Sequence, residues 1–383
     1  MKNNKWLKFS LLSISLFIMS HVAIAPAIPK LYDVYHAQDA SVSLASVETL
    51  VTIPAMMIMV AVVLSNVLVT KLGKKRTVEL GLALIFISSL VTFLASSFQI
   101  ALIGRLLLGL GIGLYNPLSI SMISDFYRDE QRAGMIGLRT ATMNIGKTIT
   151  TFIAGYAMLL GTRYIFLVYL LAVPVLILFH VFVTEVPFEE KELSKIIIFD
   201  RDVILWMLIT FFIGMAYIGA TVKIPSLLVM HYGYDEMVSS YLLTLLAFSG
   251  IMIGVFFGYV SKVLKGQTLT LMLAMMALGN CFFVLGNQLV FFYIGAVLIG
   301  ASFVGGMSAI FDAIAQHYPR EQINFVTSMA ITAGNVGVIL TPLVLTKLLG
   351  LLSLETFVTP FYITAGLMLF SLAIYAMLKF KKK

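Results

Sequence analysis

Charged residues are scarce in this chain. Only 11% of its 383 residues are Asp, Glu, Lys or Arg, whereas 60% are hydrophobic; soluble domains have about 25% charged and about 45–50% apolar residues. The shortage of charge extends along the whole sequence, which excludes a soluble enzyme with one anchor, a disordered chain and a cytosolic catalyst. The single cysteine, Cys281, also excludes an internal disulfide. The composition is that of a polytopic membrane protein.

Apolar runs of the length that crosses a bilayer recur along the chain. A helix needs about 20 apolar residues to cross about 30 Å of hydrocarbon. Twelve such runs are separated by charged residues or by Gly and Pro. We therefore predict an all-α membrane protein with twelve transmembrane helices, near residues 7–28, 46–69, 78–97, 99–122, 134–160, 164–184, 203–226, 237–260, 268–287, 289–314, 323–348 and 357–379.

Lysine and arginine are unequally divided between the two sides of these spans. If the spans alternate in direction, 20 of the 26 basic residues fall on one side and three on the other. Such an excess marks the cytoplasm, so both termini are predicted to be cytoplasmic. The net charge of +8 follows from this asymmetry, and no nucleic-acid partner is expected. The Lys-rich start could instead be a cleaved secretory signal, but its removal would leave eleven spans and undo the asymmetry.

A polar interruption divides the sequence into two parts. It predicts a six-helix half at 1–184, a cytoplasmic linker at 185–202 and a second six-helix half at 203–383. The sequence from Tyr127, Tyr-Arg-Asp-Glu-Gln-Arg, aligns with Tyr-Pro-Arg-Glu-Gln-Ile from Tyr318, an offset of 191 residues. Pseudo-symmetric six-helix halves with a binding site between them near the midplane are a transporter architecture.

Several motifs resemble those of the major facilitator superfamily. Residues 66–76 read Asn-Val-Leu-Val-Thr-Lys-Leu-Gly-Lys-Lys-Arg, similar to the family's G-x-x-x-D-R/K-x-G-x-R/K-R/K loop. Residues 105–111, Arg-Leu-Leu-Leu-Gly-Leu-Gly, are similar to its R-x-x-x-G-x-G stretch. The resemblance covers essentially the whole chain and implies the major facilitator fold. It points toward the branch of drug or metabolite:proton antiporters.

The chain departs from that family pattern in two places. Thr70 stands where the loop motif has an acidic residue that takes part in a charge relay at the cytoplasmic gate, which puts such gating in doubt here. The window Thr150–Gly155 lacks the Gly-Pro pair of the drug antiporters. The resemblance still implies a cytoplasmic gate, whose candidate residues are Lys71, Gly73, Lys74, Lys75, Arg76, Asp125 and Asp312.

Lys147 is the strongest anomaly within the predicted spans. It lies about 13 residues into the span 134–160 and so near the midplane. Ionisable groups at that depth are costly and are functional by default. We expect Lys147 to bind an anionic group of the substrate or to couple its protonation to transport. The alternative is a structural pair with a carboxylate or with backbone carbonyls.

Three other basic residues lie within predicted spans. Arg105 is expected to position the substrate or a proton carrier, or else to snorkel to the outer interface. His21 lies at mid-depth and is suited to proton coupling, although a packing histidine is the simpler interpretation. Arg139 could share a cavity face with Lys147, but snorkelling is the simpler account. The polar neutral residues expected to line the same cavity, or to hydrogen bond between helices, are Tyr115, Asn116 and Asn144.

These features predict a secondary active transporter that works by alternating access. Proton-coupled efflux of an amphipathic drug-like compound or metabolite is favoured, and the absence of a midplane Asp or Glu indicates an anionic or zwitterionic cargo. The alternative is proton-coupled uptake of a small organic anion; a passive channel or a non-transporting membrane protein is the other class.

An enzyme is not expected, because no P-loop or metal-ligand spacing is present. No cofactor or metal is expected either. The predicted partners are a small-molecule substrate, protons and the lipid bilayer. We expect a monomer, multi-pass in the cell membrane, with short loops typical of a bacterial inner membrane.

Overall fold

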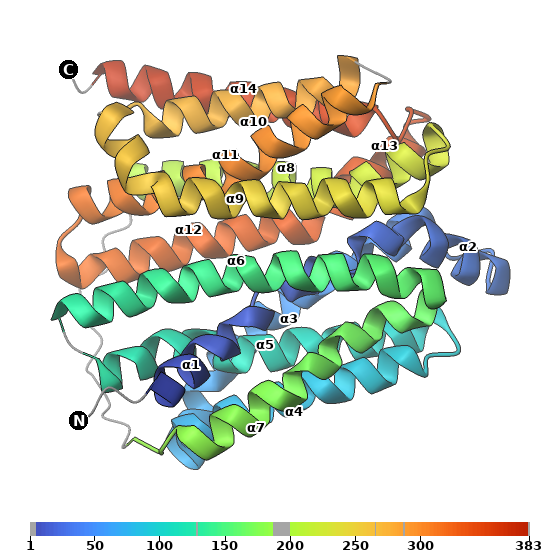
Figure 1. Ribbon diagram of the computed structural model, residues 1–383. Helices are drawn as coiled ribbons and strands as arrows, with labels where there is room; N and C mark the ends of the chain where they lie inside the picture. The colour runs from blue at the N-terminus through green and yellow to red at the C-terminus, as the bar shows by residue number, and fades with distance from the viewer. Residues whose placement is uncertain (1–4, 128, 187–199, 265, 286–287, 382–383) are drawn as a thin grey trace. The chain divides into compact units, whose positions relative to one another are not determined.

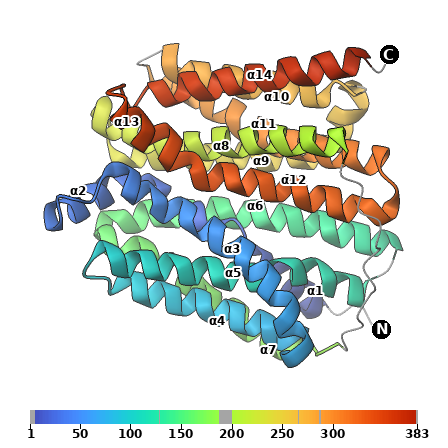
Figure 2. The ribbon, with the colours of Figure 1, turned by 180° about the vertical axis from the view of Figure 1, so that it is seen from behind.

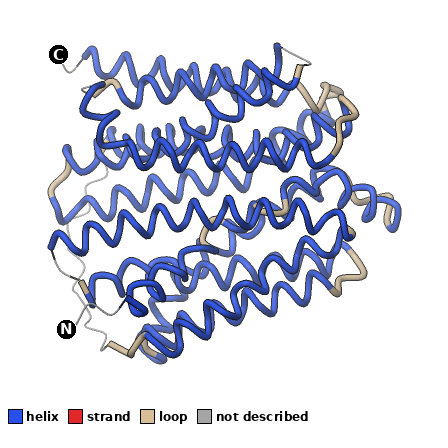
Figure 3. Tube along the Cα trace, viewed as in Figure 1, coloured by secondary structure: helices blue, strands red, loops and turns tan. Residues whose placement is uncertain are grey.

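The structure, a computed structural model, describes residues 5–127, 129–186, 200–264, 266–285 and 288–381. These residues form helices and connecting loops, with no strand among them (Figures 1 and 3). The chain divides into two compact units, Met1–Glu190 and Lys191–Lys383. Most of the predicted linker at 185–202 lies outside the described residues.

The N-terminal unit is built around α5, which packs against both α3 and α4 (Figure 2). Its elements are α1 (Lys5–Ser13), the 3₁₀ turns η1 (Ile14–Phe17), η2 (Ser20–Val22) and η3 (Ala25–Ala27), α2 (Ile28–Gln38), α3 (Leu44–Leu72), α4 (Lys74–Phe93), α5 (Phe98–Phe126), α6 (Asp129–Leu160), the 3₁₀ segment η4 (Thr162–Leu171) and α7 (Ala172–Phe182).

The C-terminal unit has α8 in contact with α12 and α14, and α11 in contact with α9 and α10. Its elements are α8 (Arg201–Pro225), the π-helical η5 (Ser226–His231), α9 (Glu236–Leu264), α10 (Thr268–Leu285), α11 (Leu289–His317), α12 (Arg320–Pro342), the π-helical η6 (Leu343–Leu348), α13 (Leu349–Leu351) and α14 (Thr359–Lys381).

The number of membrane-spanning helices is only partly established. Within the described residues, ten helices are long and apolar enough to span a membrane, or eleven if the bent first pair is one span. The predicted span at 134–160 is a continuous helix, α6, of 32 residues. It is not among the ten. Twelve spans and cytoplasmic termini therefore stay predictions.

The internal repeat extends well beyond the matched sequence motif. Helices α5 and α11 each have 29 residues, and both their first and last residues differ by 191 positions. Tyr127 and Tyr318 directly follow these two helices. Helices α3 and α9 also have 29 residues each, at an offset of 192. The two units are thus built on one helical plan, although most of their residues differ.

The first span is not the continuous helix predicted at 7–28. Two helical segments, Lys5–Phe17 and Ser20–Gln38, meet at a bend of 41°. Pro26 and Pro29 account for the part of the departure that follows the bend, because neither has the N–H that would bond to the carbonyl four residues earlier, that of Val22 or Ala25. The intervening N–H groups form tighter bonds instead, such as Ala23 N to Ser20 O at 2.9 Å and Ala27 N to Ile24 O at 3.0 Å. This segment is called the broken segment (residues 14–27) below.

Helix α6 packs directly on the broken segment at a glycine. A Cβ atom at Gly146 would overlap the backbone of Leu16. The repeat-related Gly337 of α12 meets the backbone of Phe211 of α8 in the same way. In each unit a glycine therefore lets the helix after the repeat motif touch the backbone of the unit's first span.

Replacement of Gly146 by Ala should destabilise the N-terminal unit, because the added methyl group must displace a backbone. Overpacking of this kind costs about 1–3 kcal/mol. Gly137→Ala is the matched control on the same helix, since nothing lies within 4 Å of its Cβ position and Ala gains up to about 1 kcal/mol of helix propensity. Thermal unfolding, followed by tryptophan fluorescence, should show a lower Tm for the first variant only. Equal Tm values would contradict the close contact.

Candidate functional site

Arg105 of α5 joins three parts of the N-terminal unit. Its side chain is fully buried, so it does not snorkel to the outer interface. Its Nε donates to the Leu50 carbonyl oxygen at 2.6 Å, one Nη to the Tyr169 hydroxyl at 2.7 Å, and the other Nη to the His21 carbonyl. The Leu50 carbonyl accepts a side-chain donor because Pro54, four residues later, has no N–H to offer.

Tyr169 of η4 continues this network into the broken segment. Its hydroxyl donates to the Ser20 carbonyl oxygen at 2.9 Å. The Ser20 hydroxyl in turn donates to the Phe17 carbonyl oxygen at 2.8 Å. Side chains thus add hydrogen bonds to carbonyls of the broken segment, including that of Ser20, which also accepts from the Ala23 N–H. Sequence analysis missed Tyr169, because a tyrosine in an apolar run carries no signal of its partner.

Lys147 and His21 lie beside this network. Lys147 is 3% exposed and follows Gly146, the residue that contacts the broken segment. His21 is 7% exposed, and the positive charges of Arg105 and Lys147 both act on it. Its Nδ1 has no hydrogen-bond partner among the described residues. A lysine next to the broken segment and a histidine within it are therefore both buried inside the unit.

Arg139 forms a second polar cluster, between α5 and α6. Its Nε donates to the Ser119 hydroxyl at 2.6 Å and its Nη to the Asn116 side-chain oxygen at 2.8 Å. Only 7% of Arg139 is exposed, so the expected snorkelling does not occur. Tyr115 is next to Asn116, fully buried, and its hydroxyl has no hydrogen-bond partner in the described part of the chain.

The helical rise gives the relative depths of these groups. Arg139 is 10 residues from the start of α6, and Asn116 is 10 residues from the end of α5, about 15 Å along each helix. Lys147 is 18 residues from the same end of α6 and Arg105 is 21 from the same end of α5, about 27 and 32 Å. The two helices thus carry two buried polar levels.

Asn144 is only half-buried and does not join either level by a hydrogen bond. Its amide donates to the Thr140 carbonyl oxygen of its own helix at 3.0 Å. Glu48, in contrast, is fully buried near the start of α3, and sequence analysis did not single it out. Its only sequence signal is an acidic residue at the edge of an apolar run. The other buried charges within the spans of this unit, those of Arg105, Arg139 and Lys147, are basic.

The repeat-related positions of the C-terminal unit carry no charge. Ala296, Ala330 and Val338 stand 191 residues after Arg105, Arg139 and Lys147. That unit instead buries Lys223 on α8. It also has a hydrogen bond between helices, in which the Thr364 hydroxyl donates to the Asn280 side-chain oxygen at 2.8 Å.

The loop between α3 and α4 is fastened to its neighbours by charged groups. Lys74 forms an ion pair with Asp125 at the end of α5, with 2.6 Å between Nζ and Oδ2. Lys71 and Arg76, also predicted for the gate, are exposed. Asp312 is exposed on α11 of the other unit, where it accepts a hydrogen bond from Gln316 at 2.9 Å.

Glu185 supplies a carboxylate to the same loop. Its Oε1 accepts from the backbone N–H of Lys75 at 3.1 Å, in the first turn of α4, where a carboxylate complements the helix dipole. The carboxylate also occupies the place that a side chain at residue 73 would need. The Gly73 backbone, with φ of 85°, further favours glycine. The predicted Gly73 is thus required by two local constraints.

The described residues contain no group of three or more His, Cys, Asp or Glu that could hold a metal ion. The arrangement in the N-terminal unit is instead a set of buried cations and hydrogen-bonding groups around a broken span.

Comparisons with known proteins agree on one family. The family model of the Major Facilitator Superfamily matches residues 10–342. The methylenomycin A resistance protein of Bacillus subtilis is 34% identical over 103 residues, which are 26% of this chain and 22% of that protein. The quinolone resistance protein NorB of Staphylococcus aureus is 27% identical over 166 residues, 43% of this chain and 35% of that protein. The chain thus matches well under half the length of these curated relatives.

Solved structures show the same fold. The bacterial homolog of the human lysosomal transporter Spinster, inward-facing and unoccupied, has a TM-score of 0.74 at 14% identity, covering 98% of this chain and 97% of that one. The D-xylose-proton symporter has a TM-score of 0.75 at 14% identity, covering 96% of each chain. The human organic anion transporter MFSD10 has a TM-score of 0.72 at 15% identity, covering 97% of this chain and 99% of that one.

Loss of the Arg105 guanidinium should destabilise the N-terminal unit strongly. Arg105→Met leaves three buried acceptors without this donor, and each unsatisfied group costs about 1–3 kcal/mol. Tyr169→Phe should cost less. Thermal unfolding followed by tryptophan fluorescence tests this, with Arg163→Met, an exposed arginine, as the control that should change stability by no more than about 0.5 kcal/mol. A Tm for Arg105→Met equal to that of the control would refute the structural role.

Proposed function

The chain belongs to the Major Facilitator Superfamily, and from that premise we propose a secondary active transporter that works by alternating access and exports an amphipathic, drug-like or metabolite compound in exchange for protons. The membership of this family supports the following general conclusions without the proposal. The protein is a multi-pass transporter of the cell membrane, not an enzyme, and its relatives include drug-resistance proteins.

The buried Lys147 is the observation that carries the proposal for the cargo. Lys147 follows Gly146, which contacts the broken segment, and His21 belongs to that segment and has an Nδ1 that offers a further hydrogen-bonding atom. A carboxylate or phosphate on the cargo would complement both groups, since hydrogen bonds between charged partners are the stronger ones. The surplus of buried basic residues over Glu48 further favours an anionic or zwitterionic cargo.

The remaining predicted site residues receive separate roles in this proposal. Arg105 acts as a positioning residue, because its guanidinium donates to two backbone carbonyls and to the Tyr169 hydroxyl. His21 is proposed to bind cargo or carry the coupled proton. The second level, Arg139 with Asn116 and Tyr115, would contact cargo on its way to the cytoplasmic side. The proposed cytoplasmic gate comprises Lys71, Gly73, Lys74, Lys75, Arg76, Asp125 and Asp312.

Proton-coupled uptake of a small organic anion is the alternative. The missing Gly-Pro pair in the window Thr150–Gly155 favours it, and the buried cations would serve it equally well. A passive channel would contain the same groups but would not show saturable counterflow. Action as a monomer in a bacterial inner membrane stays a prediction.

Proton coupling should be visible in proteoliposomes with an acidic lumen. Addition of an anionic or zwitterionic amphipathic compound that is a substrate should discharge the pH gradient, because each transport cycle moves protons in exchange. Lumenal pH is followed with a fluorescent indicator, and empty liposomes are the control. A response to cationic drugs alone would contradict the cargo chemistry. No response to any compound, together with counterflow of a labelled anion, would contradict proton coupling.

Lys147 variants separate anion binding from proton release. Lys147→Ala should lower counterflow of an anionic substrate about tenfold or more, since a hydrogen bond to a charged group contributes about 1.5–3 kcal/mol. If the charge binds the anion, Lys147→Arg should retain more binding than Ala. If transport requires the side chain at position 147 to lose its proton, Lys147→Arg should lose transport as well, because arginine does not deprotonate in proteins. Lys262→Ala, an exposed lysine of α9, is the control. Wild-type transport in both Lys147 variants would refute either role.

A further inference from the structure

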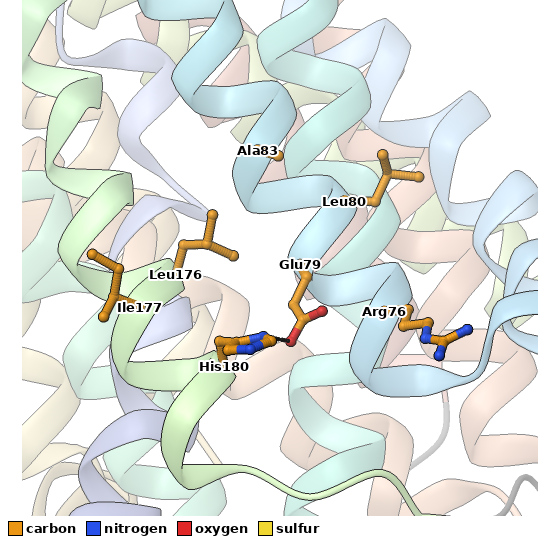
Figure 4. A pocket seen from close by; sticks show the side chains of 7 residues that line it. All are labelled: Arg76, Glu79, Leu80, Ala83, Leu176, Ile177 and His180. Atoms are coloured by element: carbon orange, nitrogen blue, oxygen red, sulfur yellow. Dashed lines mark hydrogen bonds and ion pairs between the residues drawn. The ribbon is translucent and has the colours of Figure 1, made fainter.

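A groove lies on the N-terminal unit between α4 and α7, away from the buried cations. It has a volume of about 520 Å³, and Figure 4 shows its lining residues. Such a volume is within the range of small-molecule sites, about 300–1,000 Å³. Its lining side chains are Arg76, Glu79, Leu80, Ala83, Leu176, Ile177 and His180.

The two ends of this groove differ in polarity. Arg76 and Glu79 belong to the first turns of α4, and His180 to the last turn of α7, so the polar end lies where both helices leave the apolar layer. Glu79 and His180 face each other from the two helices, with 2.9 Å between Oε1 and Nδ1 (Figure 4). The next turns of the two helices, deeper along the spans, line the groove with apolar side chains only.

The polar end of the groove exposes a guanidinium group. Arg76 is exposed. Lys75 adds a second cation there, because its Nζ donates to the His180 carbonyl oxygen at 2.8 Å. Glu79 is the one carboxylate lining the groove, and its Oε1 is already engaged by His180 and lies 3.9 Å from the Lys75 ammonium. Glu185 adds a second carboxylate near this end, and its Oε1 accepts from the Lys75 backbone N–H at 3.1 Å. Both carboxylates are thus engaged by neighbouring groups, and the exposed Arg76 is the cation that favours an anion in the groove.

The apolar end is open to the bilayer. Leu80 is 39% and Ile177 is 58% exposed, and Ala83 contributes only a methyl group between them. A small residue between two larger ones leaves a hollow that an acyl chain can fill. The basic residues at the polar end of the groove lie on the side of the membrane predicted to be cytoplasmic, where anionic lipids attract Lys and Arg.

We propose that this groove binds one anionic phospholipid of the cytoplasmic leaflet, with its phosphate at Arg76 and Lys75 and an acyl chain along Leu80, Ala83 and Ile177. Charge complementarity selects the headgroup, and the apolar floor selects a lipid over a free phosphate. The site is separate from the proposed cargo site, so neither depends on the other.

Native mass spectrometry of the purified, delipidated protein tests the proposal. The protein is incubated with equal amounts of phosphatidylglycerol and phosphatidylcholine that have the same acyl chains, and bound lipids are counted. Phosphatidylglycerol should be retained in preference. Arg76→Gln should lower its retention about fivefold, which corresponds to the attraction of one basic residue to an anionic surface, without changing retention of phosphatidylcholine.

Ala83→Phe fills the apolar end and should lower retention of both lipids. Two variants are matched controls that should retain lipid as the wild type does. Lys262→Gln removes an exposed cation elsewhere, and Ile87→Phe enlarges an exposed side chain one turn along α4. Thermal unfolding shows whether each variant is folded.

Three outcomes would overturn the proposal. Equal retention of the two lipids by the wild type would remove the headgroup preference. An equal loss in Arg76→Gln and Lys262→Gln would mean general attraction without a site. Displacement of phosphatidylglycerol by glycerol 3-phosphate alone would mean a free-anion site.

Discussion

Backbone carbonyls inside a membrane must be satisfied by the protein, because the hydrocarbon layer offers no donors. The broken segment is not a regular α-helix, because Pro26 and Pro29 lack backbone N–H donors and the chain forms tighter 3₁₀ hydrogen bonds. Side chains from two other elements add donors to the 3₁₀ stretch before these prolines, where the Ser20 carbonyl also accepts from the Ala23 N–H. Arg105 and Tyr169 donate to the His21 and Ser20 carbonyls. The positions of Lys147 and His21 follow from this arrangement, because α6 can approach the broken segment only where Gly146 has no side chain.

Much of this architecture is readable from the sequence, and the parts that are not have clear physical reasons. Apolar runs and the 191-residue offset predict the helical fold, and the position of Lys147 predicts a buried ammonium. The bend of the first span is signalled by its two prolines, yet a hydropathy pattern cannot show that the helix breaks. Arg139 was interpreted as snorkelling because Ser119, its acceptor 20 positions earlier, lies on another helix. Tyr169, Glu48 and Glu185 were missed because partners distant in sequence leave no local pattern.

The two units share a helical plan but not a distribution of charge. Helices α5 and α11 match in length and register, whereas the basic residues of the first have apolar counterparts in the second. The two repeated units therefore share glycines that permit close helix contacts, such as Gly146 and Gly337, while their polar residues differ. Packing constrains both copies equally because each must bury the same helix contacts. The buried charges instead lie at different positions in the two units, Lys223 of α8 being the one noted in the second.

The span of the Arg105 network along the chain has a consequence for biosynthesis. His21 is 84 residues from Arg105, and Ser20 is 149 residues from Tyr169. At about 5–20 residues per second, Tyr169 is synthesised roughly 7–30 s after Ser20. During that interval the broken segment has left the ribosome without the side chains that satisfy its carbonyls. The complete network of Arg105 and Tyr169 with the first span can therefore form only after the sixth predicted span has been synthesised.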